Sequence, residues 1–136
     1  MKETILSVAG KPGLFRLITR GRAMLIIESI DDAKKRIPVG TRDRVTSLND
    51  VSMYSDAGDK PLMEILQTIA DQHEAKPVSL DFKKASSAEL ADFMAAAVPD
   101  YDRDRVHDSD IRKLIQWYNI LVRGGYTQFV EAQGEA

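Results

Sequence analysis

Three acidic residues at alternate positions form the most suggestive chemical pattern in this chain. Asp100, Asp102 and Asp104 would fill the first, third and fifth positions of a calcium-binding EF-hand loop. The pattern then fails, because Arg105 stands where a sharp turn needs glycine and Ile111 stands where a bidentate glutamate belongs. The alternative is a loop between helices whose carboxylates pair with neighbouring arginines or with helix amides. We favour this loop and expect no metal site.

Cationic side chains between residues 16 and 44 form a second pattern. Small β-barrels bind nucleic acid when cations follow the phosphates and exposed aromatic rings stack on the bases. Here Phe15 and Tyr54 are the only aromatic residues among the first 58, and either suits a core. The alternative is a solvated face whose cations protect strand edges from aggregation. The candidate residues for binding an anionic partner are Arg16, Arg20, Arg22, Lys34, Lys35, Arg36, Arg42 and Arg44.

An aromatic pair, Trp117-Tyr118, is the third candidate. Such side chains supply much of the binding energy at protein interfaces, although they are buried in cores more often. Tyr118 falls on an apolar helical stripe, and Trp117 lies at its margin, within reach of Leu114 and Leu121. Burial of both is the favoured expectation, and an anchor for a partner is the alternative.

Recognisable patterns for catalysis are missing from the sequence. His73 and His107 are far apart and lack a His-Glu-x-x-His spacing, and no Gly-x-Ser-x-Gly stretch presents a nucleophile. The chain has no cysteine, which excludes disulfides, thiolate zinc ligands and a cysteine nucleophile. We therefore expect a non-enzymatic protein without a cofactor.

The composition indicates a folded, soluble protein. Of 136 residues, 43% are hydrophobic and 29% are charged, with both signs interspersed. No apolar stretch approaches the roughly 18 residues of a membrane helix, and the first residues lack the apolar run of a signal peptide. We expect a cytoplasmic protein that does not contact membranes.

The spacing of apolar residues changes near residues 57–61 and divides the chain into two halves. Before this point, apolar and polar residues alternate between turn signals such as Gly10-Lys11-Pro12-Gly13, which is typical of an antiparallel sheet. One helical turn is expected at residues 47–50. The expected strands are residues 5–8, 14–19, 23–30, 35–39, a short one beginning at 44–47, and a last one at 51–55. A series of short strands, with a single helical turn before the last strand, follows the order of an SH3-like barrel.

After this point, apolar residues recur three and four positions apart, which predicts helices. Pro61 suits the first turn of one helix, and Ser86 with Glu89 forms a capping box for the next. The last helix is expected over residues 110–122, capped by Asp108 or Ser109. The predicted fold class is therefore α+β, a small SH3-like antiparallel β-barrel (residues 1–58) followed by a three-helix region (59–136) with a connector near 74–85.

Charge is unevenly divided between the halves. Residues 1–58 hold ten Lys and Arg against seven Asp and Glu, whereas residues 59–136 hold nine against fourteen. One interpretation is mutual attraction between the two halves, and the alternative is that the basic half faces an anionic partner.

Several blocks taken together resemble a family of uncharacterised bacterial proteins that is labelled only as a domain of unknown function. They are Gly10–Leu14, Leu25–Ser29, Asp100–Val106, and Asp110 with Lys113–Asn119, of which Asp-Arg-Asp-Arg-Val and Trp-Tyr-Asn are the most specific. The resemblance spans nearly the whole chain. It implies a cytoplasmic protein with an SH3-like first part and a helical second part, and it brings no activity or cofactor.

These observations favour a non-enzymatic module that binds another protein. The alternative is an accessory protein that binds RNA or DNA through the basic face of the barrel. The sequence does not determine the oligomeric state.

Overall fold

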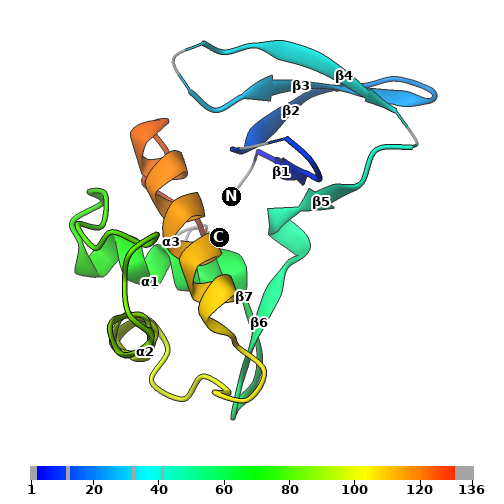
Figure 1. The fold of residues 1–136 in the computed structure, drawn as a ribbon. Helices are drawn as coiled ribbons and strands as arrows, with labels where there is room; N and C mark the ends of the chain where they lie inside the picture. The colour runs from blue at the N-terminus through cyan, green and yellow to red at the C-terminus, as the bar shows by residue number, and fades with distance from the viewer. Residues whose placement is uncertain (1–2, 12, 32, 41, 131–136) are drawn as a thin grey trace, which may run out of the picture.

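The computed structural model describes residues 3–11, 13–31, 33–40 and 42–130, and Pro12 of the expected first turn lies outside them. The first half forms an antiparallel sheet of five strands in the order β4-β3-β2-β1-β5 (Figure 1). Alternate side chains from all five strands form a small apolar cluster that includes Phe15 and Ile27. The strands are β1 (Ile5–Val8), β2 (Phe15–Arg20), β3 (Met24–Ser29), β4 (Arg36–Gly40) and β5 (Val45–Ser47).

The strand expected at residues 51–55 forms, but it does not join this sheet as the SH3-like order implied. After the 3-10 turn η1 (Leu48–Asp50), β6 (Ser52–Ser55) pairs with β7 (Gly58–Pro61) in a separate two-stranded sheet. Asp56 and Ala57 form the turn, and Gly58 takes a φ of +115°, which glycine tolerates best. The division at residues 58 and 59 stays a prediction, and the β6–β7 hairpin lies across it.

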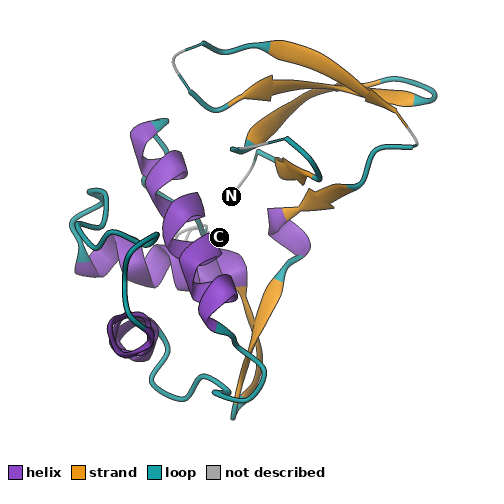
Figure 2. Ribbon diagram, in the orientation of Figure 1, coloured by secondary structure: helices purple, strands orange, loops and turns teal. Residues whose placement is uncertain are grey.

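Three helices follow, so the predicted α+β class is confirmed (Figure 2). They are α1 (Leu62–Gln72), α2 (Ser87–Ala97) and α3 (Asp108–Arg123). The capping box is confirmed, since Ser86 Oγ accepts from Glu89 N at 3.2 Å and Glu89 Oε1 accepts from Ser86 N at 3.1 Å. The expected cap of α3 was wrong, because His107 holds the N-cap position and the Asp110 carboxylate accepts from its N–H.

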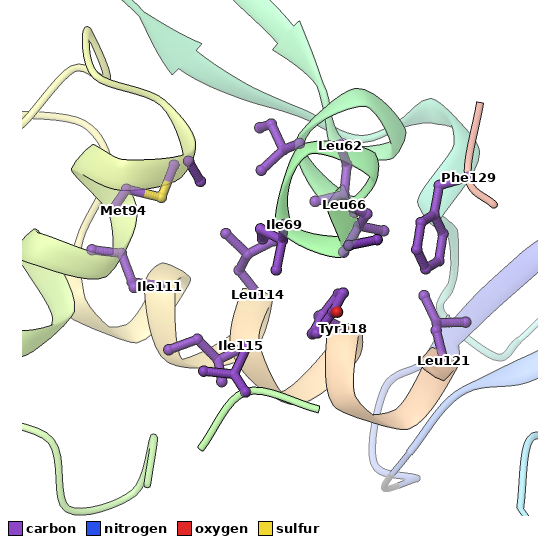
Figure 3. Close-up of a cluster of buried hydrophobic side chains, with 14 of the residues drawn as sticks. Leu62, Leu66, Ile69, Met94, Ile111, Leu114, Ile115, Tyr118, Leu121 and Phe129 are labelled. Atoms are coloured by element: carbon purple, nitrogen blue, oxygen red, sulfur yellow. The ribbon is translucent and has the colours of Figure 1, made fainter. Parts of the chain in front are cut away.

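The sheet and the helices share one apolar core. Leu66 of α1 and Leu114 and Tyr118 of α3 lie at its centre with Phe129 (Figure 3). Side chains from the sheet half join the same cluster: Ile5, Leu14, Ile30 and Leu48. Because residues of both halves are buried in the same cluster, the position of each half depends on the other.

The connector between α1 and α2 is held by polar side chains of α3. Tyr118 Oη donates to the Lys76 carbonyl at 2.7 Å, and the buried Asn119 Oδ1 accepts from Val78 N at 2.8 Å. The Arg112 guanidinium donates to two further connector carbonyls, those of Phe82 and Ala85. The connector therefore has no regular secondary structure, but its backbone is held in place by hydrogen bonds to α3.

None of the helices in the described chain is both long enough and apolar enough to cross a membrane.

Candidate functional site

A cavity of about 220 Å³ opens between β6 and the first half of α3. Its floor is apolar and comes from Leu62, Val106 and Leu114. Residues 51–54 form one wall, and Trp117 of α3 forms part of the other. We call this cavity with its rim the β6–α3 groove.

Tyr54 is held at the rim by the loop that follows α2. The Tyr54 carbonyl accepts from Asp102 N at 3.0 Å, within a β-bridge between Ser55 and Tyr101. The Tyr54 side chain is 44% exposed, and the guanidinium carbon of Arg105 lies 5.1 Å from the centre of its ring. A cation at this distance favours a fixed ring orientation.

The Asp-Arg-Asp-Arg loop is held mainly by its own groups. Asp102 Oδ1 accepts from the backbone N–H of Asp104 and of Arg105, and Asp102 Oδ2 lies 3.6 Å from Arg105 Nε. Arg103 stacks on the Tyr101 ring and donates to its hydroxyl. Within the described residues, no three His, Asp or Glu side chains converge as metal ligands do. The structure thus gives the loop the role of positioning Arg105 and Tyr54.

The aromatic pair on α3 divides between core and groove. Tyr118 is fully buried, as predicted. Trp117 is half-buried and lines the groove, so its indole joins the core on one side and the cavity on the other.

Two of the eight predicted cationic residues pair with Glu28 on the sheet, although the Arg36 side chain is still 63% exposed. Arg16, Glu28 and Arg36 face one another across β2, β3 and β4. Arg36 Nε donates to Glu28 Oε2 at 3.0 Å, and Arg16 Nε lies 3.3 Å from Glu28 Oε1 without the alignment of a hydrogen bond. Arg16 also lies 5.8 Å from the Tyr126 ring centre. Arg16 is therefore less accessible to a partner than the sequence implied, whereas Arg36 stays accessible with its charge offset by Glu28.

The other six are exposed, as Arg36 is, and the strand register places them around the sheet. Arg20 and Arg22 flank the β2–β3 turn, and the pairing of Met24 with Gly40 brings the loop after β4 to that same end. Arg42 and Arg44 lie in this loop, whereas Lys34 and Lys35 lie in the β3–β4 connection at the opposite end. The loop therefore starts near Arg20 and Arg22 and brings Arg42 to their end of the sheet, whereas the Arg44 carbonyl accepts from Ala9 N beside the end of β1, and the two lysines are separated from Arg20 and Arg22.

The groove could not be predicted from the sequence, although some of the residues that line it belong to recognisable sequence blocks. Arg105 and Val106 belong to the Asp-Arg-Asp-Arg-Val block, and Trp117 belongs to the Trp-Tyr-Asn block. Nothing in the local sequence around Tyr54 indicates that these blocks meet it. These two blocks were the most specific parts of the family resemblance, and that specificity was the available signal for the groove residues.

The comparisons with known proteins identify relatives without a described activity. A family model described as Domain of unknown function (DUF6852) matches residues 51–121, and one described as Domain of unknown function (DUF5606) matches residues 3–48. A solution NMR structure from Bacteroides vulgatus, a structural genomics target, is 51% identical with a TM-score of 0.78. That match covers 100% of this chain and 96% of the other. No curated protein matches the chain. Since the DUF6852 model covers more than half of the sequence, the chain belongs to this family of proteins of unknown function.

Proposed function

We propose that this protein is a non-enzymatic interaction module that binds another protein in the β6–α3 groove. The observation that carries the proposal is the placement of an exposed Tyr54 and a half-buried Trp117 around one cavity. Tyr, Trp and Arg are the residues most enriched among the strong contacts of protein interfaces, and Arg105 lies on the same rim.

The size of the cavity supports a protein partner over a small molecule. Sites for drug-sized ligands have volumes of about 300–1,000 Å³. The groove, at about 220 Å³, is smaller and is open to solvent along an exposed strand. A space of this kind suits one or two side chains of a partner that also contacts the rim.

The strand order supports a further proposal about the fold. We propose that the five-stranded sheet is an SH3-like barrel in which β5 returns to pair with β1 after three sequential hairpin pairings. Such barrels host many functions, so this proposal does not itself select a partner. We also propose a cytoplasmic location, which the absence of cysteine supports.

A photo-reactive phenylalanine placed at position 54 tests the binding surface. In the native host, we expect a discrete cross-linked adduct with one partner protein. The matched control carries the same group at Ala88, which is exposed on α2 and outside the groove. Equal adducts from both positions, or none from position 54, would contradict the proposal.

Binding of RNA or DNA is the second candidate. It is favoured by three exposed arginines at one end of the sheet, Arg20, Arg22 and Arg42, none of which has an ion-pair partner in the described chain. Anisotropy of a labelled single-stranded RNA would rise with protein at low salt and fall as salt increases. Arg20→Glu with Arg22→Glu would abolish the rise, while Lys34→Glu with Lys35→Glu at the opposite end would largely retain it.

A further inference from the structure

We propose that the groove recognises its partner as an extended, acidic peptide segment that pairs with the outer edge of β6 as an added strand. This inference rests on the proposed function and specifies the shape, the charge and the hydrogen bonds of the partner. Addition of a strand to an open sheet edge is an established mode of peptide recognition, in which main-chain bonds give affinity and side-chain pockets give specificity.

The hydrogen-bond register of the β6–β7 hairpin leaves an open edge at the groove. In an antiparallel pair, backbone groups point alternately toward the partner strand and away from it. Ser55 pairs with Gly58 next to the turn, and Leu62 N donates to the Val51 carbonyl. The N–H and C=O groups of the odd-numbered residues of β6 therefore point toward β7. The N–H and C=O groups of Ser52 and Tyr54 therefore point to the other edge.

This outer edge already accepts a strand at its far end. Asp102 N donates to the Tyr54 carbonyl, and Asp56 N donates to the Asp100 carbonyl, on either side of the Ser55–Tyr101 bridge. The chain then turns away, because the Asp102 carbonyl accepts from Arg105 N and Val106 N instead. In the part of the chain that the structure describes, the Tyr54 N–H and both backbone groups of Ser52 meet no other backbone group. A guest strand would continue the pairing that Tyr101 begins.

The cavity beside this edge provides a place for a side chain. Its floor of Leu62, Val106 and Leu114 is apolar, and Trp117 flanks it. Side chains of an added strand point alternately to its two faces, so one aliphatic side chain would enter the cavity while its neighbours face solvent. Burial of that side chain would add to the main-chain hydrogen bonds.

The charges that line the groove favour a carboxylate on the guest. Lys113 has no ion-pair partner in the described chain, and Arg105 meets Asp102 only through Nε, at 3.6 Å. Among the described residues, Asp110 is the one carboxylate of the lining, and it already accepts from His107 N. An acidic residue in the guest would therefore find two cations at the rim.

The same charges disfavour a second copy of this chain as the guest. In a two-fold interface each surface patch meets itself. Pairing of two β6 edges across such an axis would bring Arg105 and Lys113 of one copy toward those of the other. A foreign acidic strand avoids this repulsion.

A phage-displayed library of random linear peptides is the probe for the test. Selection on the full chain should enrich peptides that combine Asp or Glu with an aliphatic residue and lack proline. Affinities of the enriched peptides are then measured with Lys113→Glu and with Lys83→Glu, an exposed connector site with the same change in charge. We expect Lys113→Glu to weaken binding about tenfold or more and Lys83→Glu to change it little.

The strand pairing is tested on both partners. Ser52→Pro removes an outward N–H of β6 and should abolish binding. Because this variant can also disturb the hairpin, a second test methylates alternate backbone nitrogens of the peptide and leaves the protein intact. One alternate set should abolish binding and the other should be tolerated, since only one set faces β6.

The possible outcomes separate this inference from the proposed function. Binding that survives both methylated sets, or enrichment of basic peptides, overturns the acidic strand. If Trp117→Ala abolishes the binding of the peptides in either of these two cases, the groove remains the interaction site. Failure to enrich any peptide, together with no adduct from position 54, overturns both proposals. Concentration-dependent self-association that shifts the Ser52 and Tyr54 amide signals overturns the inference in favour of a second copy.

Discussion

At the residue scale, three consecutive side chains on α3 have three different surroundings. Trp117 lines the groove, Tyr118 fills the core and bonds to the connector, and Asn119 satisfies a buried amide of the connector. The sequence predicted the burial of Tyr118, because it lies on the helical stripe. It could not predict the partner of Asn119, because Val78 reaches that position only through tertiary packing.

Replacement of Asn119 by alanine should destabilise the fold. The change leaves the buried Val78 N–H without its acceptor, and an unsatisfied buried group costs about 1–3 kcal/mol. Chemical denaturation gives the free energy of unfolding. The control Gln116→Ala, on the same helix, should change that free energy by well under half as much. Equal effects from the two variants would contradict the role given to Asn119.

Tyr126 makes stability depend on alkaline pH. Burial, followed by the hydrogen bond that its hydroxyl donates to Glu3, raises the pKa of Tyr126 to about 12. An unfolded tyrosine ionises near pH 10, so the stabilising contribution is complete below about pH 10 and is lost as pH rises through about 12. The free energy of unfolding should therefore fall across this window, and Tyr126→Phe should flatten the fall. Burial also raises the pKa of Tyr118, so some slope should persist in the variant. An unchanged slope would show that Tyr126 does not carry the effect.

At the element scale, local signals predicted the elements and the antiparallel pairing of consecutive strands well, but not the pairing of β6. The capping box from Ser86 to Glu89 lies within four consecutive residues, so its sequence determines the start of α2 almost alone. The pairing of β6 was missed because the hairpin turn at Asp56-Ala57 resembles a break between two halves. The groove was missed for the same kind of reason, since Tyr54 and Trp117 meet only when a distant helix packs beside the hairpin.

The end of α3 contacts the sheet through a glycine. A Cβ atom at Gly124 would lie 2.4 Å from Ile30 Cγ2, which no packed structure tolerates without movement. Gly124→Ala should therefore lower the free energy of unfolding by about 1–3 kcal/mol, the usual cost of overpacking.

The matched control is Gly40→Ala, where an added Cβ meets nothing within 4 Å. This variant should leave the free energy of unfolding nearly unchanged. Combining Gly124→Ala with Ile30→Ala should cost less than the sum of the two single changes, because the second removes the clash. Additive losses would mean that the contact is not the cause.

At the scale of the whole molecule, the shared core predicts that the sheet and the helices unfold as one cooperative unit. Leu66 is fully buried in that core, and a carboxylate there has no partner. Leu66→Asp should cost several kcal/mol and unfold both halves. Amide signals from β1 to β5 and the helical circular dichroism should disappear together on heating. Ala88→Asp, at an exposed position, serves as the control. Survival of the sheet after the helices have melted would contradict a single core.

Hydrogen exchange of the protein with its natural partner, identified by the cross-link at position 54, tests most directly that the β6–α3 groove is the binding surface. We predict slower exchange in the complex at residues 51–54 and 105–117. Slower exchange confined to residues 20–24 and 42–44, with the groove unchanged, would contradict the proposed site and place binding at the arginine-rich end of the sheet.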